Sequence, residues 1–161
     1  MRSDHVKSLA ASTIAVTALF LQIAGCVATQ SEPRATPEYP RQPFTLESAP
    51  WGEPYNGPLG IPRGAQRAVL WVDPVSNGDT YYARFPAGTR FEPHWHAYAE
   101  YAVVLRGQLT HVLAEKASSL KAGDYVVIPP KVNHGWEVDP GGDAYLLIRR
   151  DGPADTNFVA R

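Results

Sequence analysis

The sequence predicts an all-β domain, and two features of its residue pattern carry this prediction. Short runs rich in Val, Ile, Leu and aromatic residues alternate with clusters of Pro, Gly, Asn and Asp, at intervals of about 8 to 12 residues. No stretch within the expected domain shows sustained helical periodicity. Together these features are typical of an antiparallel sandwich or barrel, in which the chain turns back after every short strand.

The expected strands follow one another along the chain. Each is an apolar or aromatic run that stops at a turn-forming cluster, for example DPVSNGD after the first run and PAG after the second. The runs are residues 68–72, 80–85, 100–106, 108–114, 125–130 and 144–150. We expect them to form one barrel over residues 68–151, followed by a C-terminal tail at 152–161.

The chain begins with the features of an export signal. Arg2 and Lys7 precede an uncharged apolar stretch, which is the order found in secretory signal peptides. The residues IAGC that end this stretch resemble the lipobox of bacterial lipoprotein precursors, and Cys26 is the only cysteine in the chain. We therefore predict a lipoprotein signal peptide at 1–25 and lipidation of Cys26. An uncleaved membrane helix is the alternative, since the stretch approaches the roughly 20 residues that span a bilayer.

Lipidation would place the protein in the cell envelope, anchored to a membrane. More than one acyl chain on Cys26 would hold it stably, since each buried methylene contributes about 0.8 kcal/mol. Val27 stands where an aspartate is often linked to retention in the inner membrane. The outer membrane is therefore favoured, on its periplasmic side or at the surface.

Two segments connect the expected anchor to the barrel. Residues 26–44 are rich in Pro, Ser and Thr and poor in aliphatic residues, so we predict a flexible tether. Residues 45–67 add Trp51 and Tyr55 to a Pro- and Gly-rich composition, and we expect an ordered N-terminal arm against the barrel. The formal net charge is −1 and no basic run is present, which argues against a nucleic acid partner.

The residues that carry chemistry are concentrated in GTRFEPHWHAYAEYAVVLRG, residues 88–107. In a strand, residues i and i+2 point to the same side, so His94 and His96 would project together. Glu100 would return to that side if the residues before it turn, and His134, after a Pro-Pro turn, is a candidate fourth ligand. Three imidazoles and one carboxylate suit a divalent first-row metal: Fe, Mn, Ni, Cu or Zn.

The alternative is a set of unrelated surface and core histidines. That interpretation would be preferred for any single histidine, yet three of the five histidines in the chain fall in this group. His111 lies between Leu109 and Leu113 in a strand-like pattern. We expect it to be a hydrogen-bonded strand residue and not a ligand.

These residues resemble the two motifs of the cupin superfamily. The first motif is glycine, five residues, His-x-His, three or four residues, Glu, six residues, glycine. It is matched by Gly88, His94, His96, Glu100 and Gly107. The second is glycine, five residues, Pro-x-Gly, two residues, His, three residues, Asn. It is matched at Gly123, Pro129 and His134, with Lys131 in place of the glycine and Val138 in place of the asparagine. These departures affect the local turn and not the ligand.

The resemblance implies a double-stranded β-helix, the jelly-roll barrel of cupins, with a metal inside near one mouth. It assigns His94, His96, Glu100 and His134 as metal ligands. It favours one divalent ion, Fe or Mn first, with Zn, Ni or Cu possible. Four protein ligands would leave two positions of a six-coordinate metal for water, substrate or oxygen. Small single-barrel cupins often pair through sheet faces or swapped arms, so the resemblance also suggests a homodimer.

Function is less constrained than fold, because one fold supports many activities. The first hypothesis is an envelope-anchored metalloenzyme acting on a small organic molecule. A dioxygenase is its most concrete form, and Glu100 is its candidate catalytic base. The second is a non-catalytic lipoprotein that binds or senses a metal or small ligand. A carbohydrate isomerase or epimerase is a third hypothesis, without distinctive support.

Overall fold

The computed structural model describes residues 38–58 and 60–159. The predicted signal peptide, the lipidation site Cys26 and the tether up to residue 37 lie outside the described residues. Within the described part of the chain, no helix is long and apolar enough to cross a membrane.

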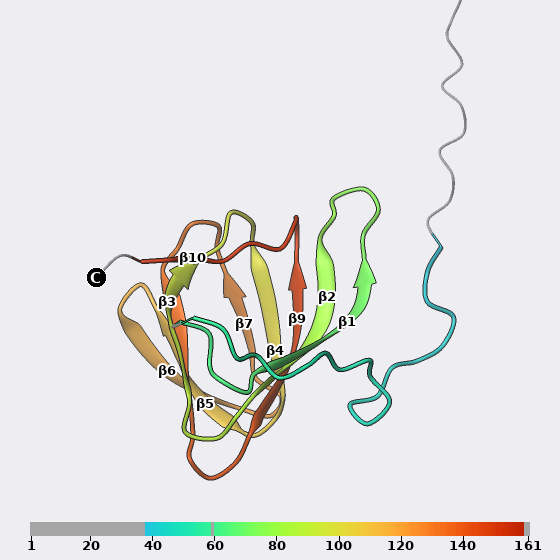
Figure 1. Ribbon diagram of the computed structural model, residues 1–161. Helices are drawn as coiled ribbons and strands as arrows, with labels where there is room; N and C mark the ends of the chain where they lie inside the picture. The colour runs from blue at the N-terminus through green and yellow to red at the C-terminus, as the bar shows by residue number, and fades with distance from the viewer. Residues whose placement is uncertain (1–37, 59, 160–161) are drawn as a thin grey trace, which may run out of the picture. The chain divides into compact units, whose positions relative to one another are not determined.

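The described chain is built from ten β-strands in two antiparallel sheets (Figure 1). Sheet A has the order β1-β2-β9-β4-β7, and sheet B has the order β10-β3-β8-β5-β6. The strands are β1 Gln66–Val72, β2 Asp79–Phe85, β3 Arg90–Trp95, β4 Glu100–Arg106, β5 Gln108–Leu113, β6 Lys116–Lys121, β7 Tyr125–Ile128, β8 His134–Val138, β9 Ala144–Arg150 and β10 Asn157–Phe158. The prediction of an all-β jelly-roll barrel is confirmed.

Strict alternation of side chains produces the core between the two sheets. In β2, Tyr81, Ala83 and Phe85 are buried, whereas the residues between them are only partly so. Strand β4 repeats the pattern with Ala102 and Val104. Because successive strand residues point to opposite faces, this period of two buries one face of each strand. From sheet B, Leu109, Trp136 and Val138 complete the same hydrophobic cluster.

Four strands were not among the runs that the sequence identified: β3, β6, β8 and β10. Of these, only the strand that carries His94 was considered, through the His-x-His pattern. Strand β6, KASSLK, is almost wholly exposed, so it has no apolar face to reveal it. It is nevertheless paired with β5 along its whole length. Strand β10 lies within the predicted C-terminal tail and has only two residues, too few for an alternation pattern.

The segments before β1 and after β9 lie against the barrel. Trp51 stacks on Tyr82 and meets Tyr145 edge-on, so it covers the outer side of β2 and β9. The Tyr55 N–H donates to the carbonyl of Ala65, which folds the arm back on itself. After β9 the chain passes over one end of the barrel and pairs as β10 with β3 (Figure 1).

Gly107, between β4 and β5, provides a test of the fold. Its φ is +84°, and an added Cβ would lie 2.4 Å from the carbonyl oxygen of Asp143. We expect Gly107→Ala to lower the free energy of unfolding by at least about 2 kcal/mol, measured by urea denaturation. Gly142→Ala is the matched control, because an added Cβ there meets nothing within 4 Å. Equal stability of the two variants would contradict the account of this turn.

Candidate metal centre

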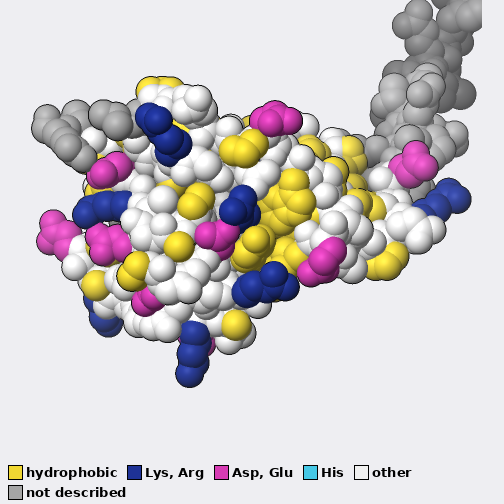
Figure 2. Space-filling model, turned by 60° about the horizontal axis from the view of Figure 1, so that its bottom comes forward, with side chains coloured by type: hydrophobic (Ala, Val, Ile, Leu, Met, Phe, Trp, Pro, Cys, Tyr) yellow, Lys and Arg dark blue, Asp and Glu magenta, His cyan; other side chains and the backbone are white. Residues whose placement is uncertain are grey.

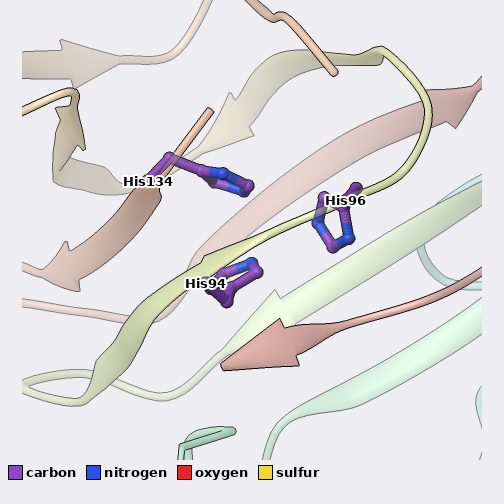
Figure 3. A group of neighbouring side chains, drawn as sticks. All are labelled: His94, His96 and His134. Atoms are coloured by element: carbon purple, nitrogen blue, oxygen red, sulfur yellow. The ribbon is translucent and has the colours of Figure 1, made fainter. Parts of the chain in front are cut away.

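Three histidines from two neighbouring strands converge inside the barrel. His94 lies on β3, His96 follows directly after its end, and His134 begins β8. The β3–β8 pairing sets His94 opposite His134, with a register shift on the Pro93 side of this pair. Proline has no N–H for a ladder, so an irregularity is expected there. Figure 3 shows the three rings turned toward a common point.

The three side chains are almost completely buried. Their exposed fractions are 1% for His94, 2% for His96 and 1% for His134. One nitrogen from each ring belongs to a group of atoms that all lie within 4.8 Å of one another, close enough to hold one metal ion. No histidine is visible among the described side chains on the face that Figure 2 presents. The centre is therefore internal.

Backbone carbonyls fix the orientation of all three rings through Nδ1. Nδ1 of His94 lies 2.7 Å from the oxygen of Glu92, and Nδ1 of His134 lies 3.1 Å from that of Val132. Nδ1 of His96 lies at the carbonyl oxygen of Asp155. A carbonyl only accepts, so each Nδ1 carries the proton and each Nε2 keeps a lone pair. This is the tautomer of a metal-bound histidine whose other nitrogen is held by an oxygen.

The donor set fits a metal in a further respect. The Nε2 atom of His134 is buried and has no hydrogen-bond partner among the described residues. A buried polar atom left without a partner is costly and calls for an explanation. A metal ion held by the three imidazoles would supply the missing interaction.

Burial also keeps the histidines uncharged. Desolvation, together with the neighbouring His134, lowers the pKa of His94 to about 3. The pKa values of His96 and His134 are lowered as well, again chiefly by burial. Neutral imidazoles are the form that binds metal, so the three residues are ready to act as ligands at neutral pH.

Glu100, the fourth predicted ligand, lies beside the three histidines but is bonded to an arginine. Its side chain is 2% exposed, and its Oε2 is 3.3 Å from Nε2 of His96. The same Oε2 accepts a hydrogen bond from Nε of Arg150 at 2.8 Å. Arg150 also places Nη2 3.4 Å from Nε2 of His96. Ligation by Glu100 therefore stays a prediction, with Arg150 as its established partner.

Sequence reasoning missed Arg150, although one signal was available. In β9 the buried residues are Ala144, Leu146 and Ile148, so alternation places residue 150 on the same inner face. The β4–β9 register then sets Arg150 directly opposite Glu100. Applying the period of two to the end of this run would have identified a buried arginine near the predicted ligands.

His111 lies on the paired strand β5 and outside the group of three histidines, as expected, but its side chain is not fully hydrogen-bonded. It is 3% exposed, and its Nε2 is buried without a hydrogen-bond partner in the described part of the chain. Its ring packs on Trp136 at 4.2 Å and lies 6.0 Å from the ring of His134. His111 thus borders the centre without belonging to the group of three.

Lys131 performs the role of the glycine that it replaces in the second motif. Its φ is +62°, the left-handed conformation that glycine adopts most easily. Its N–H donates to the carbonyl of His96 at 2.8 Å. The turn before β8 is therefore formed despite the substitution, and it ties the segment carrying His134 to the segment carrying His96.

Acid should destabilise the metal-free protein through its buried histidines. In the folded chain the pKa values of His94 and His111 are about 3 and about 4, whereas the ordinary value is near 6.5. Between the folded and the ordinary pKa, the unfolded chain therefore binds more protons than the folded chain does. Stability is therefore lost as pH falls below about 6.5, at up to about 1.4 kcal/mol per pH unit for each histidine. Urea denaturation of EDTA-treated protein at pH 7, 6 and 5 measures this loss in the free energy of unfolding.

The control for the acid effect is His111→Gln, which removes one of these buried imidazoles. Its stability should fall less steeply with decreasing pH than that of the unchanged chain. A free energy of unfolding that stays constant from pH 7 to pH 5 in the unchanged chain would contradict burial of neutral histidines.

Comparison with known proteins agrees with this architecture. Residues 81–148 match the cupin domain family, whereas no curated protein sequence matches the chain. A cupin-2 domain from Rhodospirillum rubrum aligns with a TM-score of 0.62 at 15% identity, covering 77% of this chain and 84% of the other. A cupin 2 conserved barrel protein from Rhodopseudomonas palustris gives 0.59 at 21%, covering 70% and 78%.

A cupin-like protein from Thermotoga maritima is also similar, with a TM-score of 0.52 at 26% identity, covering 60% of this chain and 77% of that one. At these identities the structural likeness establishes the fold. The match over residues 81–148 contains all four predicted ligands. His94 lies on β3, Glu100 on β4, His96 between these strands, and His134 on β8. The barrel of this chain therefore has the cupin fold, and residues 81–148 match the cupin domain.

Proposed function

We propose that this chain is a metal-dependent enzyme of the cell envelope that acts on a small organic molecule. The observation that carries the proposal is the buried group of three histidines, each with Nδ1 held by a backbone carbonyl. Residues of this kind suit a divalent first-row ion, with Fe or Mn favoured and Zn, Ni or Cu possible. Such an ion supplies Lewis acidity and, for Fe or Mn, redox chemistry with dioxygen.

The side chains around the centre have separable roles in this proposal. His94, His96 and His134 hold the ion, and burial excludes bulk water from it. Glu100 is the carboxylate beside them, with Oε2 engaged by Arg150. Its Oε1 is the oxygen that would complete the ligand set or accept a proton from a bound substrate. A dioxygenase is the most concrete form of this enzyme.

Metal content tests the centre directly. The full-length chain, purified gently in mild detergent, should contain near one equivalent of a divalent first-row metal by elemental mass spectrometry. The double variant His94→Ala/His134→Ala should lose it, because two of three buried ligands are gone. His111→Gln is the matched control: another buried histidine is removed and the metal should remain.

The outcome also separates the candidate functions. Iron or manganese directs the next step to oxygen consumption with a panel of small molecules. Zinc, nickel or copper keeps the site and favours isomerisation or binding. Tight ligand retention without turnover would assign the alternative function, a non-catalytic binding or sensing lipoprotein. A folded chain that takes up no metal on reconstitution would contradict the proposal.

We also propose that Cys26 carries the lipid that keeps the protein in the outer membrane, which rests on the sequence features described above. Cys26→Ala should move the protein from the membrane fraction of bacterial cells to the soluble periplasmic or secreted fraction. A variant that stays with the membrane as firmly as the unchanged chain would contradict lipid anchoring. The homodimer stays a prediction, which light scattering of the purified chain can check.

A further inference from the structure

A cavity of about 430 Å³ adjoins the histidine centre, on the inner side of β1 and β2. Three of its lining residues contact the metal-binding histidines. Phe91 stacks on His94 with ring centroids 4.2 Å apart. The backbone oxygen of Asp155 holds Nδ1 of His96, and Nη2 of Arg150 lies 3.4 Å from its Nε2. A molecule in this cavity would therefore lie next to the centre.

Two arginines line this cavity and contact the same aromatic ring. The Cζ atoms of Arg67 and Arg150 lie 4.2 and 5.4 Å from the ring centroid of Tyr81. The strand β2, which carries Tyr81, runs between β1 and β9, which carry the arginines. The side chain of Arg67 is 41% exposed and that of Arg150 is 8% exposed. The two guanidinium groups thus extend from the surface toward the buried centre.

Each arginine keeps donor capacity beyond its ion pair. Arg67 pairs with Asp79, and Arg150 donates from Nε to Glu100. A guanidinium has five N–H donors in a planar fork and matches a carboxylate bidentately. A second carboxylate can therefore be bound by donors that the first does not use. The negative charge of a ligand carboxylate would also reduce the repulsion between the two positive groups.

The rest of the cavity is suited to a flat apolar group. Phe85 and Phe91 contact each other edge-on, with ring centroids 5.7 Å apart, and both line the cavity. Ile61 from the arm and Ala83 from β2 add further apolar surface. Apolar walls with a few placed polar groups are the usual composition of small-molecule sites.

Two acidic residues, Asp155 and Glu53, also line the cavity and bear on its affinity for an anion. Asp155 accepts hydrogen bonds at Oδ2 from the N–H of Ala97 and from the side chain of Asn157. Its Oδ1 is buried without a hydrogen-bond partner among the described residues and lies 3.9 Å from Nδ1 of His96. Glu53 is exposed. A divalent ion at the histidines would add two positive charges at the inner end, which strengthens attraction for an anion.

We propose that this cavity binds a small carboxylate with a flat apolar body, the carboxylate between Arg67 and Arg150 and the body against Phe85 and Phe91. The inference rests on the proposed function only in identifying this ligand as the substrate. Binding itself requires the arginines and the cavity.

The test uses three probes of similar shape and different charge: benzoate, benzamide and benzamidine. Binding to the full-length chain in mild detergent is measured by calorimetry, with EDTA-treated protein and with protein loaded with Mn²⁺. We expect benzoate to bind at least about fivefold more tightly than either other probe without metal, and the preference to increase with Mn²⁺. Equal affinities for the three probes in both states would overturn the inference.

A charge-balanced variant tests whether Arg67 causes the preference for benzoate. Arg67→Gln/Asp79→Asn removes one charge of each sign, so it does not leave the buried Asp79 unpaired. It should reduce the preference for benzoate to less than about twofold while its unfolding temperature stays close to that of the unchanged chain. Arg90→Gln, an exposed arginine that pairs with Glu137 outside the cavity, should keep the preference. An undiminished preference in the double variant would overturn the assignment.

Failure of this inference can be told apart from failure of the proposed function. A chain that binds Mn²⁺ but treats the three probes alike contradicts the carboxylate site and keeps the metal centre. A chain that binds no metal but prefers benzoate through Arg67 contradicts the metalloenzyme and supports the carboxylate site.

Discussion

The candidate site depends on one constraint: the two sheets bury polar side chains between them, and each must be given a partner. His94, His96, Glu100 and His134 are at most 2% exposed, and Arg150 is 7% exposed. An unpaired buried charge costs several kcal/mol, and a buried polar atom without a hydrogen bond costs about 1–3 kcal/mol. The chain meets this cost with backbone carbonyls at every Nδ1 and with the Glu100–Arg150 pair. The same partners fix the direction in which each ligand atom points.

Strand register is therefore part of the site as well as of the fold. Glu100 lies opposite Arg150 in sheet A, and His94 lies opposite His134 in sheet B. A slip of one residue would move one member of each pair to the outer face of its sheet. The N–H of Lys131 on the carbonyl of His96 adds a link between the two motif segments. Pairing that stabilises the barrel thus also assembles the centre, so a change that disturbs one is expected to disturb the other.

The sequence predicted the features that depend on local spacing. Alternation revealed the long strands, and the His-x-His pattern at His94 and His96 placed two imidazoles on one side of the chain. Strands without an apolar face, such as β6, gave no such pattern. The contacts of Arg150 and Asp155 join residues fifty or more positions apart, so they depend on a register that the sequence does not state. The three histidines that converge could be predicted from spacing. Alternation along β9 could also have indicated a buried Arg150, whereas its pairing with Glu100 and the contact of Asp155 with His96 required the strand register and the path of the chain after β9.

Glu100 and Arg150 determine the charge balance of the buried site. Burial keeps the three imidazoles neutral, so they contribute no charge to balance a cation. Glu100 is the carboxylate beside Nε2 of His96, and Arg150 already neutralises it. A divalent ion at the histidines would consequently leave an excess of positive charge in a buried site. A ligand that brings its own negative charge would relieve this excess, and we expect it in the cavity that Arg150 lines.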